Sequence, residues 1–263
     1  MVVSSAPIAP RGTAMKLRHA LAALLLVLCP ALDAEPLRVG LSPDYPPIAW
    51  RSGDRIVGLE ADNARAVGEI LSREVSLVPL PFDGLIPALL AGDIDVIMSG
   101  LSVTAERSRI VRFADPYLRV GQMAILHRDK VLRFGQPWAI YQPGVRIGVE
   151  PGTTGAAFAE RELPDAEVAF FPNPDSAFEA LREDRIDLYI HDAPTSWRLA
   201  TSSENDDMIS LYRPLTEEQL AWAVAPGNSD LLEDLDRALS LMRGAGTLGY
   251  IINRWIPVEV TVQ

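Results

Sequence analysis

The sequence predicts an α/β protein of two lobes, each built on a mostly parallel sheet flanked by helices. The first observation is an internal repeat, because LRVGLSPDY at 37–45 and VRIGVEPGT at 145–153 share the pattern apolar-Arg-apolar-Gly-apolar. ALLAGDIDVIMSG at 88–100 likewise matches ALREDRIDLYIHD at 180–192. The second observation is that near-continuously apolar strands alternate with helical patterns, which is typical of parallel sheets covered by helices. Matched segments in the same order indicate two similar sheets.

The first half opens with the strand LRVGL at 37–41 and a helix over 61–72, whose apolar residues recur at helical spacing. The strand EVSLVPL at 74–80 follows, rich in β-branched residues. A helix over 83–91 then leads into the strand DVIMSG at 95–100. This order is the one expected for successive strand-helix-strand units.

The second half repeats that order. The strand VRIGVE at 145–150 precedes a helix over 154–162, and the strand EVAFF at 167–171 precedes a helix over 175–183. The strand IDLYIH at 186–191 closes the unit. The same supersecondary unit is therefore expected twice in one chain.

Two extended segments are predicted to cross between the lobes. LRVGQMAILHRD at 118–129 would lead into the second lobe, and QLAWAVAPG at 219–227 would lead back to a helix over 230–243. The resulting boundaries are a first lobe over 35–122, a second lobe over 123–221 and a return segment over 222–263.

Residues 1–34 have the features of a signal peptide. Lys16 and Arg18 precede an apolar run that ends near Leu28, and Ala34 is a suitable cleavage point. The run is shorter than the ~20 apolar residues that a membrane-spanning helix needs. Met15 is an alternative start of the protein. We therefore expect an exported, periplasmic protein.

The composition excludes several classes of function. Cys29 follows a leucine rather than the small residue usual before a lipid-modified cysteine, so we do not expect a lipoprotein. The formal net charge is −11, and loss of 1–34 removes three basic residues and one acidic residue, which leaves −13 and no cysteine. Thiol chemistry and disulfides are thereby excluded, and nucleic acid or an anionic membrane is disfavoured as a partner. We expect a monomer.

The candidate binding residues lie in loops that follow strands. In open parallel sheets, ligands bind beyond the carboxyl ends of the strands. The loops there are SPDYPP, SGLSVTAER, EPGTTG and HDAPTS, which are rich in hydroxyl, glycine and charged residues. Two lobes that face each other with such loops would enclose a cleft.

The segment SGLSVTAERSRI at 99–110 places arginines in an acidic chain. Ser99 and Ser102 offer hydroxyls, and Gly100 offers a backbone N–H that no side chain obstructs. Arg107 lies five residues beyond Ser102, and a guanidinium grips both oxygens of a carboxylate in a fork. We therefore predict a carboxylate-binding site in this segment.

Each of these assignments has an alternative that the spacing leaves open. Arg109 and Arg112 are expected at the surface, and Arg107 could equally be a solvated charge at a helix end. Asp192 follows the matching strand of the second half, where it would face an ammonium group. It could equally cap a helix that starts at APTSW.

The loop EPGTTG at 150–155 precedes a predicted helix. Glycine and threonine at a helix start suit anion binding, but the lysine of a nucleotide-binding P-loop is missing. Thr153 or Thr154 could equally be an ordinary N-cap. Glu150 opens this loop, and its counterpart in the repeat is Ser42.

Aromatic residues near these loops could enclose a ligand side chain or belong to the core. The candidates are Tyr45, Trp50 and Phe82. No Gly-x-Ser-x-Gly motif occurs, and neither His127 nor His191 has metal-ligand spacing to another histidine or cysteine. We therefore predict no catalytic residues, no metal and no cofactor.

Five motifs are spread over about 37–256, namely YPPIAW, GLEADNARAVGEIL, FDGLIPALLAGDIDVIMSGLSVTAERSRIVRFADPY, GVEPGTTG and IDLYIHDAPT. In these motifs the chain resembles the periplasmic solute-binding proteins of polar amino-acid ABC transporters. The long central motif is highly specific. The resemblance implies the two-lobed periplasmic-binding-protein fold, with a ligand cleft between the lobes and an ABC permease as partner.

The resemblance also implies residue roles. The positions of Ser102, Arg107 and Thr154, with the backbone near Gly100, would bind the α-carboxylate of an amino acid. The position of Asp192 would bind the α-ammonium group. Tyr45 and Phe82 would enclose the ligand side chain.

The chain departs from the family pattern at the side-chain end of the site. Ser42 stands where many binders of glutamine or basic amino acids carry Asp, and Glu150 stands where others carry Leu or Lys. GLEAD replaces the usual Gly-Phe-Asp-x-Asp, which we attribute to helix capping. An ionised Glu150 would need a cation or strong donors, so we expect a polar or basic ligand.

Two other interpretations remain open. The sequence also resembles cyclohexadienyl dehydratases, which need an acid positioned to expel hydroxide and a carboxylate. The matching segment places Gln219 or Leu220 near that acid, with Glu217 and Glu218 close by. We expect a non-enzymatic binding protein, with a dehydratase-like enzyme as the alternative and a sensor or docking module as a third interpretation.

Overall fold

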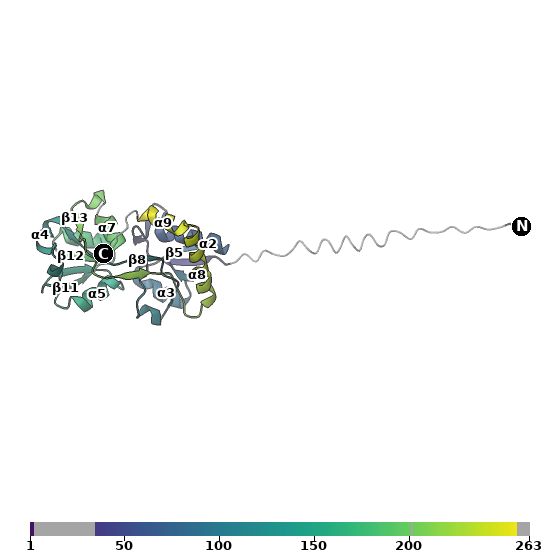
Figure 1. Ribbon diagram of the computed structural model, residues 1–263, viewed down its shortest axis with the longest axis horizontal. Helices are drawn as coiled ribbons and strands as arrows, with labels where there is room; N and C mark the ends of the chain where they lie inside the picture. The colour runs from purple at the N-terminus through teal and green to yellow at the C-terminus, as the bar shows by residue number, and fades with distance from the viewer. Residues whose placement is uncertain (3–34, 201, 257–263) are drawn as a thin grey trace. The chain divides into compact units, whose positions relative to one another are not determined.

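In the computed structural model (Figure 1), strand β1 (Leu37–Leu41) is the second strand of the first sheet and has a neighbouring strand on each side. β5 (Val75–Pro79) pairs with it in parallel on one side, and β6 (Val96–Ile97) does so on the other. β15 (Ala223–Val224) then joins β6, and β7 (Arg112–Phe113) joins β15, both antiparallel. The sheet order is β5-β1-β6-β15-β7.

The second sheet repeats this plan. β10 (Arg146–Val149) lies between β11 (Glu167–Phe170) and β12 (Leu188–Asp192), parallel to both. β9 (Gln122–His127) and β13 (Met208–Ser210) extend it antiparallel, in the order β11-β10-β12-β9-β13. The two α/β sheets predicted from the sequence repeat are confirmed.

The prediction of mostly parallel sheets is confirmed. Four of the five strands of each sheet run in one direction and one strand, β15 or β9, runs opposite to them, so the sheets are mixed. The reason is topological: β9 and β15 each follow a crossing segment, and they enter their sheet from the end opposite to the strands of the repeat.

The structure describes residues 1–2, 35–200 and 202–256. The signal peptide predicted over 1–34 therefore lies outside the described residues except for its first two. Within the described part of the chain, no helix is long and apolar enough to cross a membrane.

Helices cover both faces of the first sheet. α2 (Leu59–Leu71), α8 (Ser229–Gly244) and α9 (Thr247–Trp255) contact one another. Their buried apolar residues form one core with Leu37 and Val39 of β1. α3 (Leu85–Ala91) packs on the other face against Ile97 of β6. Because side chains alternate along a strand, one sheet carries two hydrophobic layers.

The second sheet is covered in the same way. Leu188 and Ile190 of β12 join a core that includes buried residues of α5 (Thr154–Glu162). Tyr189, between them, points to a separate core formed with α6 (Pro174–Arg182). Further helices and turns are η2 (Phe82–Gly84), η3 (Arg107–Arg109), η4 (Arg128–Lys130), α4 (Val131–Phe134), η5 (Pro137–Tyr141), α7 (Ala193–Ala200) and η6 (Ser203–Asn205).

Most helix predictions match the structure within two residues. The helix over 154–162 has the predicted bounds, whereas the one expected over 83–91 is divided into η2 and α3. The sequence patterns did not indicate α9, nor the small sheet of β2 (Asp44–Tyr45), β3 (Ala49–Ser52) and β4 (Arg55–Val57). These strands are two to four residues long, too short to show a period.

The two crossing segments pair with each other. β8 (Leu118–Val120) runs antiparallel to β14 (Glu218–Leu220). Just beyond β8 the chain enters β9 of the second sheet, and just beyond β14 it enters β15 of the first. The lobe boundaries at 122/123 and 221/222 remain a prediction, and Gln122 already belongs to β9.

Candidate ligand-binding site

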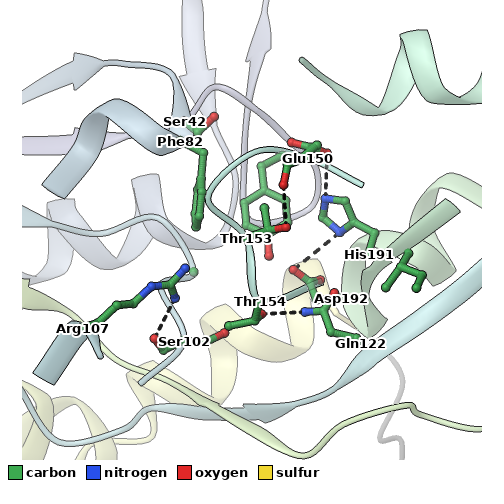
Figure 2. Close-up of a pocket in the computed structure, with 13 residues that line it drawn as sticks. Ser42, Phe82, Ser102, Arg107, Gln122, Glu150, Thr153, Thr154, His191 and Asp192 are labelled. Atoms are coloured by element: carbon green, nitrogen blue, oxygen red, sulfur yellow. Dashed lines mark hydrogen bonds and ion pairs between the residues drawn. The ribbon is translucent and has the colours of Figure 1, made fainter. Parts of the chain in front are cut away.

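A pocket lies where the strand-end loops of the two sheets meet (Figure 2). It encloses about 470 Å³, part of which is open to solvent. Its lining comprises Ser42, Tyr45, Phe82, Gly100, Ser102, Arg107, Gln122, Glu150, Thr153, Thr154, Ile190, His191 and Asp192. The loops after β1, β6 and β10 and the end of β12 all contribute, as expected for the carboxyl ends of strands.

The structure brings every predicted binding residue to this pocket except Ser99 and the aromatic candidate Trp50. Ser99 is 1% exposed, and its Oγ accepts a hydrogen bond from the backbone N–H of Ser42 at 2.8 Å. Its hydroxyl therefore joins the end of β1 to the loop after β6. The prediction that Ser99 binds ligand is wrong in this structure, because the side chain points into the protein.

Arg107 is the cation of the pocket. Its guanidinium donates to the carbonyl of Ser102 at 2.8 Å and to the carbonyl of Gly152, from the second lobe, at 2.9 Å. Burial lowers the pKa of Arg107, partly opposed by the charge of Glu218. No carboxylate among the described residues forms an ion pair with it, whereas Arg109 and Arg112 are exposed as expected.

Gly100 lines the pocket, but its backbone N–H is not free for a ligand. It donates to Oε1 of Glu60 at 3.1 Å. Gly100 also has a φ of +64°, a left-handed conformation that glycine adopts without strain. The expected donation from this N–H to a ligand carboxylate is therefore contradicted, and the group instead anchors the loop to the core.

Glu60 is a fully buried carboxylate that receives four hydrogen bonds. Besides Gly100, the donors are Asn63 Nδ2, Tyr117 Oη and Trp222 Nε1, at 3.2, 2.7 and 3.0 Å. Burial raises its pKa, and these four bonds oppose the increase. The attribution of GLEAD to helix capping is wrong, because α2 has no side-chain cap. Glu60 instead positions the Gly100 loop and residues next to both crossing strands.

Asp192 combines the two roles that its sequence position allowed. Its Oδ1 accepts from the backbone N–H of Thr195 in the first turn of α7, at 3.2 Å. Its Oδ2 lies 3.6 Å from Nδ1 of His191. Burial, with a smaller contribution from the charge of Glu218, raises the pKa of Asp192 to about 7. It is an acid in need of a cationic partner.

Glu150 lines the pocket beside Tyr189 and His191. The Tyr189 hydroxyl donates to its Oε1, and Nε2 of His191 lies 3.3 Å from the same oxygen. Burial and then Glu150 raise the pKa of Tyr189 well above its usual value. Figure 2 shows Glu150, His191 and Asp192 together, across the pocket from Arg107.

The two threonines of the loop divide their roles. Thr153 is the N-cap of α5, since its Oγ1 accepts from the N–H of Ala156 at 3.1 Å and donates to the carbonyl of Glu150 at 2.8 Å. Thr154 instead donates to Oε2 of Glu218 at 2.8 Å and accepts from Nε2 of Gln122 at 3.0 Å. The capping alternative therefore holds for Thr153, and the Thr154 hydroxyl bonds to side chains.

Aromatic rings form the apolar part of the lining. Tyr45 meets Phe82 edge-on with ring centroids 6.3 Å apart, and the ring of His191 lies 5.0 Å from that of Tyr45. Trp50, which was also a candidate, packs against Trp255 at 5.1 Å and does not line the pocket. It is therefore a packing residue.

Sequence reasoning missed three residues of the pocket lining and named Glu218 only in the dehydratase alternative. Gln122, Ile190 and His191 line the pocket, and Glu218 bonds to two lining hydroxyls. A polar residue in or beside each predicted crossing segment, Gln122 and Glu218, was an available signal. Among the described residues, no group of three His, Cys, Asp or Glu side chains forms a possible metal site.

A model of the bacterial extracellular solute-binding proteins, family 3, matches residues 37–258. The chain belongs to this family. The resemblance stated from its motifs is thereby confirmed, and the mixed α/β lobes are those of its structural neighbours.

Several named proteins are similar to this family member. The ABC transporter arginine-binding protein 1 of Escherichia coli K12 is 32% identical over 235 residues, covering 86% of this chain and 93% of that protein. The cyclohexadienyl dehydratase of Pseudomonas aeruginosa is 32% identical over 163 residues, covering 62% and 61%. A solved ancestral arginine-binding protein bound to arginine has a TM-score of 0.78 and 30% identity, covering 85% and 99%.

Proposed function

We propose that the protein binds an L-amino acid in this pocket, outside the cytoplasm, and presents it to the membrane permease of an ABC transporter. The observation that carries the proposal is that one pocket is lined by both Arg107 and Asp192, two buried groups of opposite charge. A zwitterion presents the complementary pair of charges. Family membership and the arginine-binding protein of E. coli support transport as the purpose of binding.

The carboxylate end of the ligand would lie at Arg107. Two of its five N–H groups are used by carbonyls, so the others remain available as donors. Because the guanidinium is buried and has no carboxylate partner among the described residues, an incoming carboxylate would supply the missing charge. Arg107 also contacts Gly152 across the lobes, so the same residue could favour the closed form when ligand is bound.

The side chain of the ligand would reach Glu150, between Tyr45 and Phe82. A carboxylate with two rings beside it and little exposure suits a cation or a hydrogen-bond donor. The aromatic rings suit an aliphatic stem. A polar or basic L-amino acid is therefore the ligand that this lining supports best.

A thermal-shift screen of the purified protein against the common amino acids tests this function. A ligand at 100 times its Kd should add ~2.7 kcal/mol to the free energy of unfolding, because it binds only the folded state. Arginine, lysine and glutamine are expected to give the largest shifts. A panel in which no amino acid raises the melting temperature would contradict the proposal.

A second candidate function is a dehydratase, which one observation favours. The carboxylate of Glu218 reaches the pocket through Ser102 and Thr154, although the sequence match had placed Gln219 or Leu220 near that position. An acid beside the carboxylate site is what expulsion of hydroxide and a carboxylate would need. Against this function, Glu218 accepts all three of its hydrogen bonds from hydroxyls and donates none, whereas a general acid has to donate a proton.

Incubation with prephenate or arogenate decides between the two functions. Formation of the aromatic product by the wild-type protein, and its loss in Glu218→Gln, would support the enzyme. We expect no product from either substrate when the protein is used at a concentration that suffices to measure amino-acid binding.

A further inference from the structure

Glu218 connects hydroxyls from both lobes. Its Oε2 accepts from Ser102 Oγ at 2.5 Å and from Thr154 Oγ1 at 2.8 Å, and its Oε1 accepts from Thr216 Oγ1 at 2.6 Å. Ser102 follows β6 in the first lobe, whereas Thr154 begins α5 in the second. One carboxylate therefore holds together two pocket-lining residues that come from different lobes.

The backbone fixes this arrangement. Ser102 forms a β-bridge with Leu220, and the N–H of Val103 donates to the carbonyl of Gln219 at 2.8 Å. Glu218 lies at the start of the same strand, β14. Main-chain hydrogen bonds therefore hold the strand that carries Glu218 beside the loop after β6, whatever the pocket contains.

The protons of the two hydroxyls are already in use. A serine or threonine hydroxyl has a single proton to donate. Ser102 and Thr154 give theirs to Glu218, and Thr154 also accepts from Gln122. A ligand carboxylate could therefore accept from neither hydroxyl while Glu218 keeps its place.

The charge of Glu218 acts on both ends of the site. It opposes the effect of burial on the pKa of Arg107, and it adds to the effect of burial on the pKa of Asp192. The negative charge of Glu218 thus acts on both Arg107 and Asp192. It lies at the two hydroxyls that could otherwise donate to a ligand carboxylate.

We propose that Glu218 occupies the place of the ligand carboxylate in the ligand-free protein, and that the ligand must displace it from Ser102 and Thr154. This inference rests on the proposed function and adds to it a specificity-determining residue. Glu218 lowers the affinity for every ligand with a carboxylate at that position. Ligands without a carboxylate do not compete with Glu218 for these hydroxyls, so it acts on them only through its charge near Arg107 and Asp192.

The test compares Glu218→Gln with Glu217→Gln, a matched control at an exposed neighbour. Calorimetry is run with L-arginine and with L-argininamide, which lacks the carboxylate. The amide that Glu218→Gln introduces can donate to the two hydroxyls and free their protons, so L-arginine should bind about tenfold tighter than to the wild type. L-Argininamide should gain much less than L-arginine, because it does not compete for the hydroxyls, and Glu217→Gln should resemble the wild type with either probe.

Several results would overturn the inference. Unchanged or weaker L-arginine binding by Glu218→Gln would do so, and so would an equal gain for L-arginine and L-argininamide, which indicates a structural role. If Glu218→Gln does not fold, Glu218→Asp is measured instead, since its shorter side chain withdraws the carboxylate from the hydroxyls. The same gain for L-arginine is expected.

The wild-type protein separates this inference from the proposed function. If it binds amino acids but Glu218→Gln binds them no better, only the inference fails. If the wild type binds none and Glu218→Gln binds L-arginine, the competition is supported and transport by the wild type is not. If neither protein binds, both proposals fail.

Discussion

In both sheets, an arginine of the first strand of the repeat bonds to an aspartate just before a neighbouring strand. The aspartate is buried to a different extent in the two sheets. In the first lobe, Arg38 bonds to Asp95 through its backbone N–H at 2.8 Å and its guanidinium at 2.6 Å. In the second, Arg146 bonds to Asp187 at 3.0 and 2.7 Å. Asp95 is 20% exposed, whereas Asp187 is 1% exposed and also pairs with Lys130 at 2.7 Å. The repeat therefore preserves the pairing, but the aspartate of the second pair is more deeply buried and has an additional cationic partner.

The lobes differ more in what they bring to the pocket. The first lobe contributes the cation, Arg107, and the second contributes the acids Glu150 and Asp192. A zwitterion bridged between them would have its two charges on different lobes, so binding and closure would be linked. A duplicated framework can thus carry two chemically opposite halves of one site.

Removal of the cation should have the largest effect. Arg107→Ala should weaken amino-acid binding by roughly a hundred- to several-thousand-fold, because a desolvated carboxylate that loses its charged partner typically costs ~3–5 kcal/mol. Arg109→Ala is the matched control and should change little, since that side chain is exposed. Calorimetry measures both, and equal effects of the two substitutions would show that Arg107 does not bind the carboxylate.

The second prediction separates the two Arg–Asp pairs. Asp187→Asn should lower the free energy of unfolding by ~1.5–3 kcal/mol, because it removes the charge of a buried carboxylate that accepts from Lys130 and Arg146, although both cations keep Asp184 as a partner. Asp95→Asn should cost about 1 kcal/mol, as its pair is more exposed. Urea denaturation at pH 7 measures both. A larger loss for Asp95→Asn would contradict the comparison.

The same substitution has a pH dependence with a definite sign. Lys130 and Arg146 hold the pKa of Asp187 below its usual value against the effect of burial. The contribution of Asp187 to the free energy of unfolding is therefore complete above its unfolded pKa of about 3.9. It is lost only as the pH falls toward the lower pKa of the folded state. The difference in free energy of unfolding between the wild type and Asp187→Asn should therefore decrease as the pH is lowered from 5 to strongly acidic values.

The third prediction concerns the acid of the second lobe. Asp192 has a pKa of about 7 through burial, so below that pH it carries a proton and offers no charge to an ammonium group. Amino-acid affinity should fall by up to about tenfold for each pH unit below pH 7 and level off above it. Asp192→Asn, which keeps the cap on α7, should bind weakly with a flat profile. Calorimetry from pH 5 to 8 would contradict this if the wild type were flat too.

The smallest effect is expected at the side-chain end. Glu150→Gln should weaken the binding of arginine and lysine by about fivefold relative to that of leucine. The reason is that a hydrogen bond to a charged acceptor is stronger than one to an amide. A competition panel of lysine, arginine, glutamine and leucine measures the order. If the variant keeps the wild-type ranking, Glu150 does not read the ligand side chain.

Local pattern determined much of this protein in advance. Strand and helix periods and the repeat of Arg and Gly placed four loops at the carboxyl ends of strands, and ten of the twelve candidate binding residues line the pocket. The reason is that a parallel strand ends where its loop begins, so sequence position fixes spatial position. The charges of the site, Arg107 and Asp192, were visible for the same reason.

The tertiary structure alone decided how the polar groups are shared. Gly100 and Glu60 are 40 residues apart, and Ser102 and Glu218 are 116 apart, yet each pair forms a hydrogen bond. Ser99, in the bend after β6, faces inward, where its hydroxyl accepts from the N–H of Ser42. No local period encodes such partners, because a buried donor takes whichever acceptor the packed chain brings within reach.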